Sequence, residues 1–129
     1  PVLDASVSLA LSIHARRNPA ECHRILIPGG LLVVAIPAPD DLIELREAVQ
    51  GSGLERDRVE ALIADHASHF RVVERSRVHE TAACDHDAIV DLLQGTYRGA
   101  RFREQARAAR LGTLQVTLAS DVLVFARLD

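Results

Sequence analysis

The chain has 129 residues, of which 48% are hydrophobic and 26% are charged, which excludes a disordered chain and fits one globular domain with a modest core. Its 15 basic and 18 acidic residues give a net charge of -3, which excludes a chain that binds nucleic acid by being basic throughout. Any contact with nucleic acid must therefore come from a local patch.

No apolar run has the length that a membrane-spanning helix needs, and no secretory leader is visible. We therefore expect a cytoplasmic protein with no membrane partner. Cys22 and Cys84 stand far apart and in no metal-type spacing, so we expect both thiols to be reduced.

The chain begins with a predicted strand followed by a capped helix. Ser6 to Ile13 is a short apolar run typical of a strand. Asn18 can accept hydrogen bonds from the amides of a first helical turn, Pro19 fits the first helical position, and Glu21 can close a capping box. A helix is therefore predicted to start at Asn18.

A turn and a second strand follow this helix. Pro28-Gly29-Gly30 predicts the end of the helix and a reversal of the chain. Leu31 to Pro37 is apolar on both faces, which predicts a central parallel strand that helices cover on each side.

The rest of the chain continues this alternation of helices and strands, with no repeat or linker that divides it, so we expect residues 1–129 to form a single unit. The later predicted elements are helices over Asp40 to Val49, over Glu55 to Ala64 and from Asp85 or Asp87 towards Arg110, and strands over Phe70 to Thr81 and Leu114 to Leu128.

The succession of helix, Pro-Gly-Gly and apolar strand resembles the late part of a class I S-adenosylmethionine (SAM) dependent methyltransferase. The strand order of that fold is 3-2-1-4-5-7-6, with the last-placed strand antiparallel to the others. The resemblance implies an α/β, Rossmann-like sheet of which this chain carries the C-terminal half, strands four to seven with their flanking helices.

Two segments are similar to the large-subunit ribosomal RNA guanine N1-methyltransferase family. His14-Ala15-Arg16-Arg17-Asn18 stands where the family has an aromatic or similar residue, a small residue, Pro, Arg and Asn, so Arg16 departs from the pattern. Pro37 to Leu45 is similar to the family's Pro-x-x-x-His-Leu-x-Glu-Leu run, with Asp41 in place of His. The resemblance implies methyl transfer from SAM to a guanine of ribosomal RNA, with that RNA as the partner of the full-length enzyme.

Two hallmarks of the family, a four-cysteine zinc module and a Gly-rich SAM loop after strand one, are absent from the sequence, which also contains no Met. We therefore expect a C-terminal part of a longer protein's methyltransferase domain. SAM is the expected cofactor of that parent, whereas this chain alone is expected to bind no cofactor and to be inactive.

The segment after the first strand holds the candidate site residues, because ligands of open α/β sheets sit at the carboxyl ends of strands. Ser12 and Ile13 are placed against the cofactor by the resemblance. His14 is the residue of this segment that can act as a base near pH 7, and Arg16 and Arg17 can bind an RNA phosphate or stack on a base. The alternatives are an ordinary loop histidine and a solvated pair of arginines.

A second candidate RNA surface is the strongest basic concentration of the chain, in which Tyr97 and Arg98 are the predicted substrate-binding residues. Its other members are Arg101, Phe102, Arg103, Arg107 and Arg110. The alternative is a solvated helix surface.

No metal is expected, although Cys84-Asp85-His86-Asp87 and the pair of His66 and His69 are of ligating types. Neighbouring ligands in one short tract are poorly placed to close a tetrahedral site. A helix cap at Asp85 or Asp87 explains the tract more simply.

Three functions remain open. The first is part of an rRNA guanine N1-methyltransferase, and the second is part of a small-molecule methyltransferase. The third is a non-catalytic oligomerising module, in which the open edge of the first strand pairs with another chain to give a homodimer or a strand-exchanged assembly.

Overall fold

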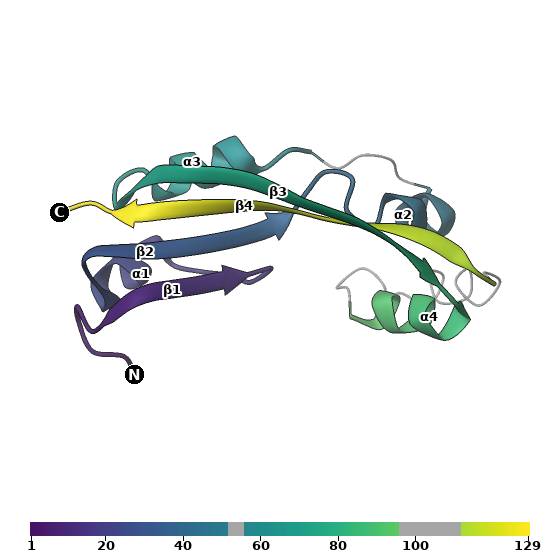
Figure 1. Cartoon of the computed structure of the whole chain (residues 1–129), viewed down its shortest axis with the longest axis horizontal. Coiled ribbons are helices and arrows are strands. Elements are labelled where there is room, and N and C mark those ends of the chain that lie inside the picture. Colours follow the sequence, from purple (N-terminus) through teal and green to yellow (C-terminus); the bar gives the residue numbers. More distant parts are fainter. Residues whose placement is uncertain (52–55, 96–111) are drawn as a thin grey trace. The chain divides into compact units, whose positions relative to one another are not determined.

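The computed structural model of the chain describes residues 1–51, 56–95 and 112–129 (Figure 1). In chain order these residues form β1 (Val7–Ile13), α1 (Pro19–Ile25), β2 (Leu26–Pro37), α2 (Ile43–Gln50), α3 (Val59–His66), β3 (Phe70–Cys84), α4 (His86–Gln94) and β4 (Leu114–Arg127).

The strands form one sheet in the order β1-β2-β4-β3. β1 pairs with β2 in parallel, and β4 pairs with β2 in the antiparallel direction. The arrows of β3 and β4 also run in opposite directions (Figure 1). This is the expected order 4-5-7-6 with an antiparallel last strand, so the fold prediction is confirmed.

Two compact units share the long strands. The first comprises Pro1–Ala38, Arg56–Val78 and Ser120–Asp129, and the second comprises the described residues of Pro39–Glu55 and His79–Ala119. Each unit has its own core: Leu32, Val34 and Phe125 are central to the first, and Leu45 and Ile89 to the second. The expectation that the whole chain forms a single unit stays a prediction.

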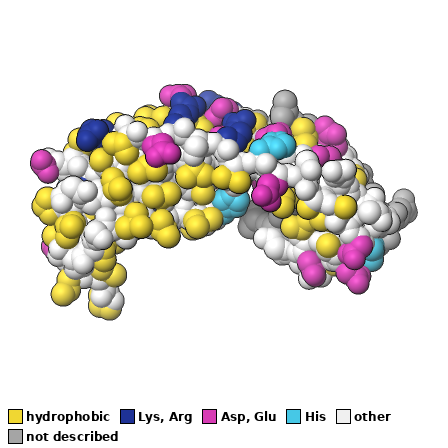
Figure 2. All heavy atoms as spheres, viewed as in Figure 1, with side chains coloured by type: hydrophobic (Ala, Val, Ile, Leu, Met, Phe, Trp, Pro, Cys, Tyr) yellow, Lys and Arg dark blue, Asp and Glu magenta, His cyan; other side chains and the backbone are white. Residues whose placement is uncertain are grey.

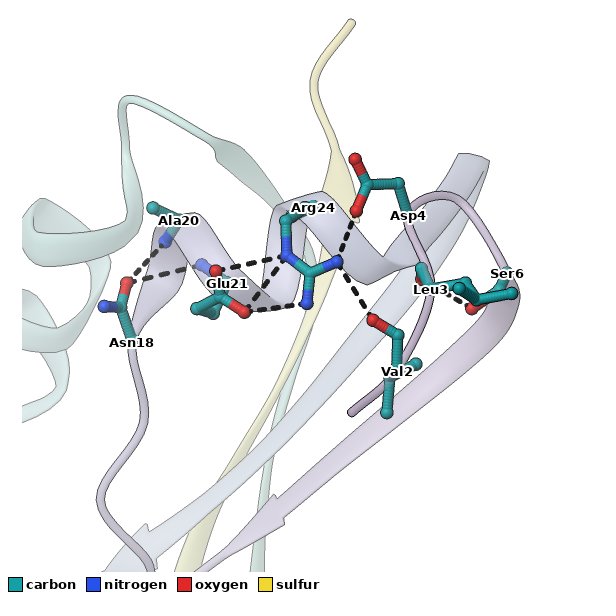
Figure 3. A network of polar contacts seen from close by, with 8 residues as sticks. All are labelled: Val2, Leu3, Asp4, Ser6, Asn18, Ala20, Glu21 and Arg24. Atoms are coloured by element: carbon teal, nitrogen blue, oxygen red, sulfur yellow. Dashed lines mark hydrogen bonds and ion pairs between the residues drawn. The ribbon is translucent and has the colours of Figure 1, made fainter.

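The start of α1 is held as the sequence predicts. The side-chain oxygen of Asn18 accepts hydrogen bonds from the backbone amides of Ala20 and Glu21, at 3.0 and 3.3 Å (Figure 3). The Glu21 carboxylate does not serve the predicted capping box but accepts hydrogen bonds from Arg24, which also pairs with Asp4. Arg24 therefore fastens the entry to β1 onto α1.

Pro28-Gly29-Gly30 lies within β2, which corrects the prediction that it ends the helix. The helix already ends at Ile25, because Leu26 pairs with Val7 of β1. The next pair is Leu9 with Leu31, so β1 advances two residues (7 to 9) while β2 advances five (26 to 31). The extra residues form a bulge, for which Gly29 supplies a φ of 76°.

The sheet of the first unit is packed on one face and open on the other. Leu32 and Val34 of β2 are fully buried on the packed face. On the open face the side chains of Leu9, Leu11 and Ile13 in β1 are 51%, 64% and 65% exposed. The prediction that helices cover both faces is therefore wrong for the described residues, and Figure 2 shows hydrophobic side chains gathered over the β1–β2 region.

In the second unit, the run that is similar to the family motif fastens α2 to β4. The Asp41 carboxylate accepts a hydrogen bond from the Ala119 amide at 2.8 Å. The Glu44 carboxylate accepts from the amide and hydroxyl of Thr117, at 2.8 and 2.6 Å. Both acidic side chains therefore occupy structural positions. No helix among the described residues is long and apolar enough to cross a membrane.

Candidate functional site

A cavity of about 550 Å³ lies in the first unit, where β1 and β2 end. The carboxyl ends of parallel strands are the usual place for ligands in open α/β sheets, and the volume is that of a small-molecule site. Its polar lining residues are His14, Arg16, Arg17, Arg58 and Asp65, and its apolar ones are Ala15, Ile36, Pro37, Ala61 and Leu62.

His14 follows β1 directly and has an unusual backbone conformation. Its φ of 47° lies in the left-handed region, which costs free energy for a residue with a side chain. The amide of His14 donates to the Ala35 carbonyl at 2.9 Å and so extends the pairing with β2. In the side chain of His14, Nε2 lies 2.9 Å from the hydroxyl oxygen of Ser120 in β4.

Arg17 reaches the cavity from the loop between β1 and α1. Its Nη1 donates to the Ala15 carbonyl at 3.0 Å, and its Nε donates to Nε2 of His66 at 3.3 Å. Arg16, beside it, is exposed and makes no hydrogen bond or ion pair with the part of the chain that the structure describes. Arg58 lines the cavity from the N-terminal end of α3.

His66 is fully buried at the C-terminal end of α3. Its Nδ1 lies 2.9 Å from the Leu62 carbonyl, which can only accept a hydrogen bond, so Nδ1 carries the proton and Nε2 accepts from Arg17. The ring stacks on Phe125 with 5.0 Å between ring centroids. Burial lowers the pKa of His66 below its ordinary value of 6.5, which keeps the ring neutral at pH 7.

The charges around the cavity favour an anionic ligand. Arg16, Arg17 and Arg58 provide three guanidinium groups, and Asp65 provides one carboxylate. Guanidinium groups match phosphate and carboxylate oxygens in geometry as well as in charge. The apolar lining residues offer a surface for a planar or aliphatic portion of the same ligand.

The structure brings three of the predicted site residues together, because His14, Arg16 and Arg17 all line this cavity. Ser12 and Ile13 lie at the end of β1 and are not among its lining residues. As neighbours on a strand they point to opposite faces of the sheet: Ile13 is 65% exposed, whereas Ser12 is buried with no hydrogen-bond partner for its hydroxyl among the described residues.

Tyr97 and Arg98 lie outside the described residues, as do the other members of that basic concentration, so that predicted surface is not tested. Sequence reasoning missed Arg58, Asp65 and Ser120. The helical spacing of Arg58, Ala61, Leu62 and Asp65 marks one face of α3, but only the folded sheet places that face beside the end of β1.

Groups of three or more potential metal ligands do not occur among the described residues. Asp85 caps α4 by accepting from the Ala88 amide at 2.9 Å, as the sequence predicts. Both ring nitrogens of His66 form hydrogen bonds within the described residues, so neither is free to bind a metal together with His69.

Two curated proteins are similar in sequence. The chain is 42% identical over 90 residues to a 23S rRNA (guanine(748)-N(1))-methyltransferase of Streptomyces fradiae, a match that covers 69% of this chain and 32% of that protein. It is 33% identical over 79 residues to a protein of Micromonospora griseorubida that is proposed to be a 23S rRNA (guanine-N(1)-)-methyltransferase, covering 61% of this chain and 23% of that one. The chain thus spans about a third or less of these relatives.

Two solved structures support the fold. The [4+2]-cyclase SpnF matches 98% of this chain and 52% of its own with a TM-score of 0.55 and 16% identity. A protein of Bacillus halodurans C-125, proposed to be a methyltransferase, matches 98% of this chain and 66% of its own with a TM-score of 0.52 and 12% identity. No protein-family model matches the chain.

Proposed function

We propose that this chain, which is similar in sequence to 23S rRNA guanine N1-methyltransferases and has part of the Rossmann-like methyltransferase fold, is the acceptor-binding part of such an enzyme. The activity is the transfer of a methyl group from SAM to the N1 atom of a guanine in large-subunit ribosomal RNA. The identity of 42% over 90 residues to the Streptomyces fradiae enzyme is the observation that carries this proposal.

We infer that the described residues do not suffice to hold SAM. The cofactor supplies the methyl group, and a loop rich in glycine usually brings backbone amides close to such a ligand. The glycine pair of the described residues, Gly29 and Gly30, lies at the opposite end of β2 from the cavity. We therefore assign most of the SAM site to the rest of the parent enzyme and only Ser12 and Ile13 to this chain.

We assign the cavity to the acceptor side of the reaction. The N1 atom of guanine carries a proton at neutral pH, so a base must accept that proton when the methyl group is transferred. His14 is the candidate, and with Nε2–H donating to Ser120 its Nδ1 has the free lone pair. Arg16 and Arg17 are the candidates for holding the RNA backbone.

Two other functions remain alternatives to the RNA methyltransferase. A small-molecule methyltransferase is the first, because the fold does not fix the acceptor, and one structural relative is named a cyclase. The second is an oligomerising module, because β1 is an edge strand with an open apolar face. The RNA function remains the proposal, in the cytoplasm and with ribosomal RNA as partner, because neither rival accounts for the sequence similarity.

The test is methyl transfer by the full-length parent. Purified parent is incubated with radiolabelled SAM and either protein-free large-subunit rRNA or a panel of small-molecule acceptors, and the modified nucleoside is identified by mass spectrometry. N1-methylguanosine in the rRNA is the expected product. Methylation of small molecules alone, or of another RNA atom, would overturn the proposal.

A further inference from the structure

We propose that Arg17 binds a phosphate group of the substrate and that the buried His66 is its positioning residue. The inference deepens the proposed function. It rests on that function only where it identifies the phosphate as part of a nucleotide in RNA. Arg17 is already a candidate for holding the RNA backbone, and the positioning role of His66 is what the structure adds.

The first step concerns the donors of Arg17. A guanidinium group has five N–H donors, of which Arg17 uses one on Nε with His66 and one on Nη1 with Ala15. Three N–H groups on Nη1 and Nη2 have no partner among the described residues. These donors belong to a residue that lines the cavity, so a ligand there can engage them.

The second step concerns how the guanidinium is fixed. A flexible arginine loses conformational entropy when it binds an anion, and a group that is already held loses less. Two protein hydrogen bonds hold the Arg17 guanidinium, one on Nε and one on Nη1, and the acceptor of the first is a fully buried ring. His66 is fixed by its hydrogen bond to the Leu62 carbonyl and by stacking on Phe125.

The third step concerns the neutral state of His66. A protonated imidazole has two donors and no acceptor, so it cannot accept the hydrogen bond from Arg17 and repels its charge. Complete burial stabilises the neutral ring. His66 occupies a core position beside Phe125 and Leu62 that would suit an apolar residue. The free ring nitrogen of the imidazole is satisfied there by the hydrogen bond from Arg17.

The fourth step concerns the ligand. Arg16 and Arg58 line the same cavity and outnumber its one carboxylate, Asp65. Arg17 therefore lies among lining residues of net positive charge and beside apolar ones. A nucleotide combines an anionic phosphate with a planar base whose faces can pack on an apolar surface. The phosphate of a nucleotide is therefore the group assigned to Arg17.

The experiment measures the affinity of the 129-residue chain for 5′-guanosine monophosphate and for guanosine by NMR titration, which also reports whether each variant is folded. Because a charge-assisted hydrogen bond contributes substantially to the binding free energy, the monophosphate should bind at least about tenfold more tightly than the nucleoside. Arg17→Ala should abolish this preference. Arg75→Ala, which removes an exposed arginine that pairs with Glu60 outside the cavity, should leave it unchanged.

His66→Phe keeps an aromatic ring against Phe125 and removes the acceptor. It should reduce the preference for the monophosphate several-fold while leaving guanosine binding unchanged, and it should have no further effect in an Arg17→Ala background. Arg17→Lys, which keeps the charge but has no Nε donor, should lose most of the preference and tests the same coupling if His66→Phe does not fold.

Equal binding of monophosphate and nucleoside by the wild type, or a preference that survives Arg17→Ala, would overturn the phosphate assignment. Additive effects of the two substitutions would overturn the positioning role of His66. A phosphate preference in a chain whose parent methylates no RNA would leave this inference standing and would reject only the proposed function.

Discussion

Nε2 of His14 lies 2.9 Å from the hydroxyl oxygen of Ser120, which joins the end of β1 to β4 across 106 positions in the sequence. A histidine held in this way has one ring nitrogen engaged and the other available. His14 also has a positive φ, as Ala5 and Leu42 do, and such backbone strain is common at functional sites. Both features support its assignment as the proton acceptor.

His14→Gln in the full-length parent should lower kcat by about a hundredfold or more, because a positioned general base contributes on that scale. The KM for RNA should change little. Ser120→Ala removes a hydrogen bond worth about 1 kcal/mol and should lower kcat by about fivefold. Single-turnover methylation of rRNA measures both, and full activity of the His14→Gln variant would exclude its role as the base.

Much of the fold follows from local sequence signals. Asn18 and Asp85 are recognisable as helix caps because a single short polar side chain is enough to reach the amides of the first turn. The strand order follows from the family resemblance. The end of α1 was misjudged because the pairing of Leu26 with Val7, a long-range contact, determines where the helix stops.

The cavity is less predictable from sequence. His14, Arg16 and Arg17 could be found because they follow a strand that ends at the ligand edge of the sheet. Ser120 and Arg58 could not, because they come from distant elements and reach the site only through the sheet order. From the sequence, His66 is only a residue of metal-ligating type where no metal is expected, and the fold shows that it is buried and accepts a hydrogen bond from Arg17.

Gly30→Ala should destabilise the chain because the added Cβ would lie 2.9 Å from the Ile27 carbonyl oxygen, in a bulge that has little room to adjust. We expect a loss of about 1–3 kcal/mol in the free energy of unfolding, typical of overpacking. Gly112→Ala is the matched control, since its Cβ would meet no atom within 4 Å and its φ is not positive. Urea denaturation followed by circular dichroism measures both, and equal stability of the two variants would contradict the account of the bulge.

The open face of β1 predicts self-association of the isolated chain. Leu11 and Ile13 are 64% and 65% exposed on an edge strand, an arrangement that favours pairing with a second copy. Sedimentation velocity at increasing concentration should show a dimer, and Leu11→Glu with Ile13→Glu should shift the chain to monomer. Val78→Glu, which places the same acidic residue at an exposed position of β3, the other edge strand, should not. A wild-type chain that stays monomeric at high concentration would contradict the homodimer.

The buried His66 predicts a pH dependence of stability. Its pKa in the folded chain is lowered by burial, so the unfolded chain, with a pKa near 6.5, binds the proton more tightly. The stability that neutral His66 contributes is therefore fully present above pH 6.5, and it is lost as the pH falls through the lower pKa of the folded state. The groups that face the ring are Arg17 and His69, which lower this pKa, and Asp65, which raises it.

The comparison that isolates this effect is the free energy of unfolding of the wild type against His66→Gln, measured by urea denaturation between pH 7.5 and 5.5. Protonation of carboxylates affects both chains alike, whereas protonation of residue 66 affects only the wild type. The advantage of the wild type over the variant should therefore shrink as the pH falls. An advantage that stays constant or grows over this range would mean that His66 is not held neutral, and Arg17 would then lack the acceptor that fixes its guanidinium in the cavity.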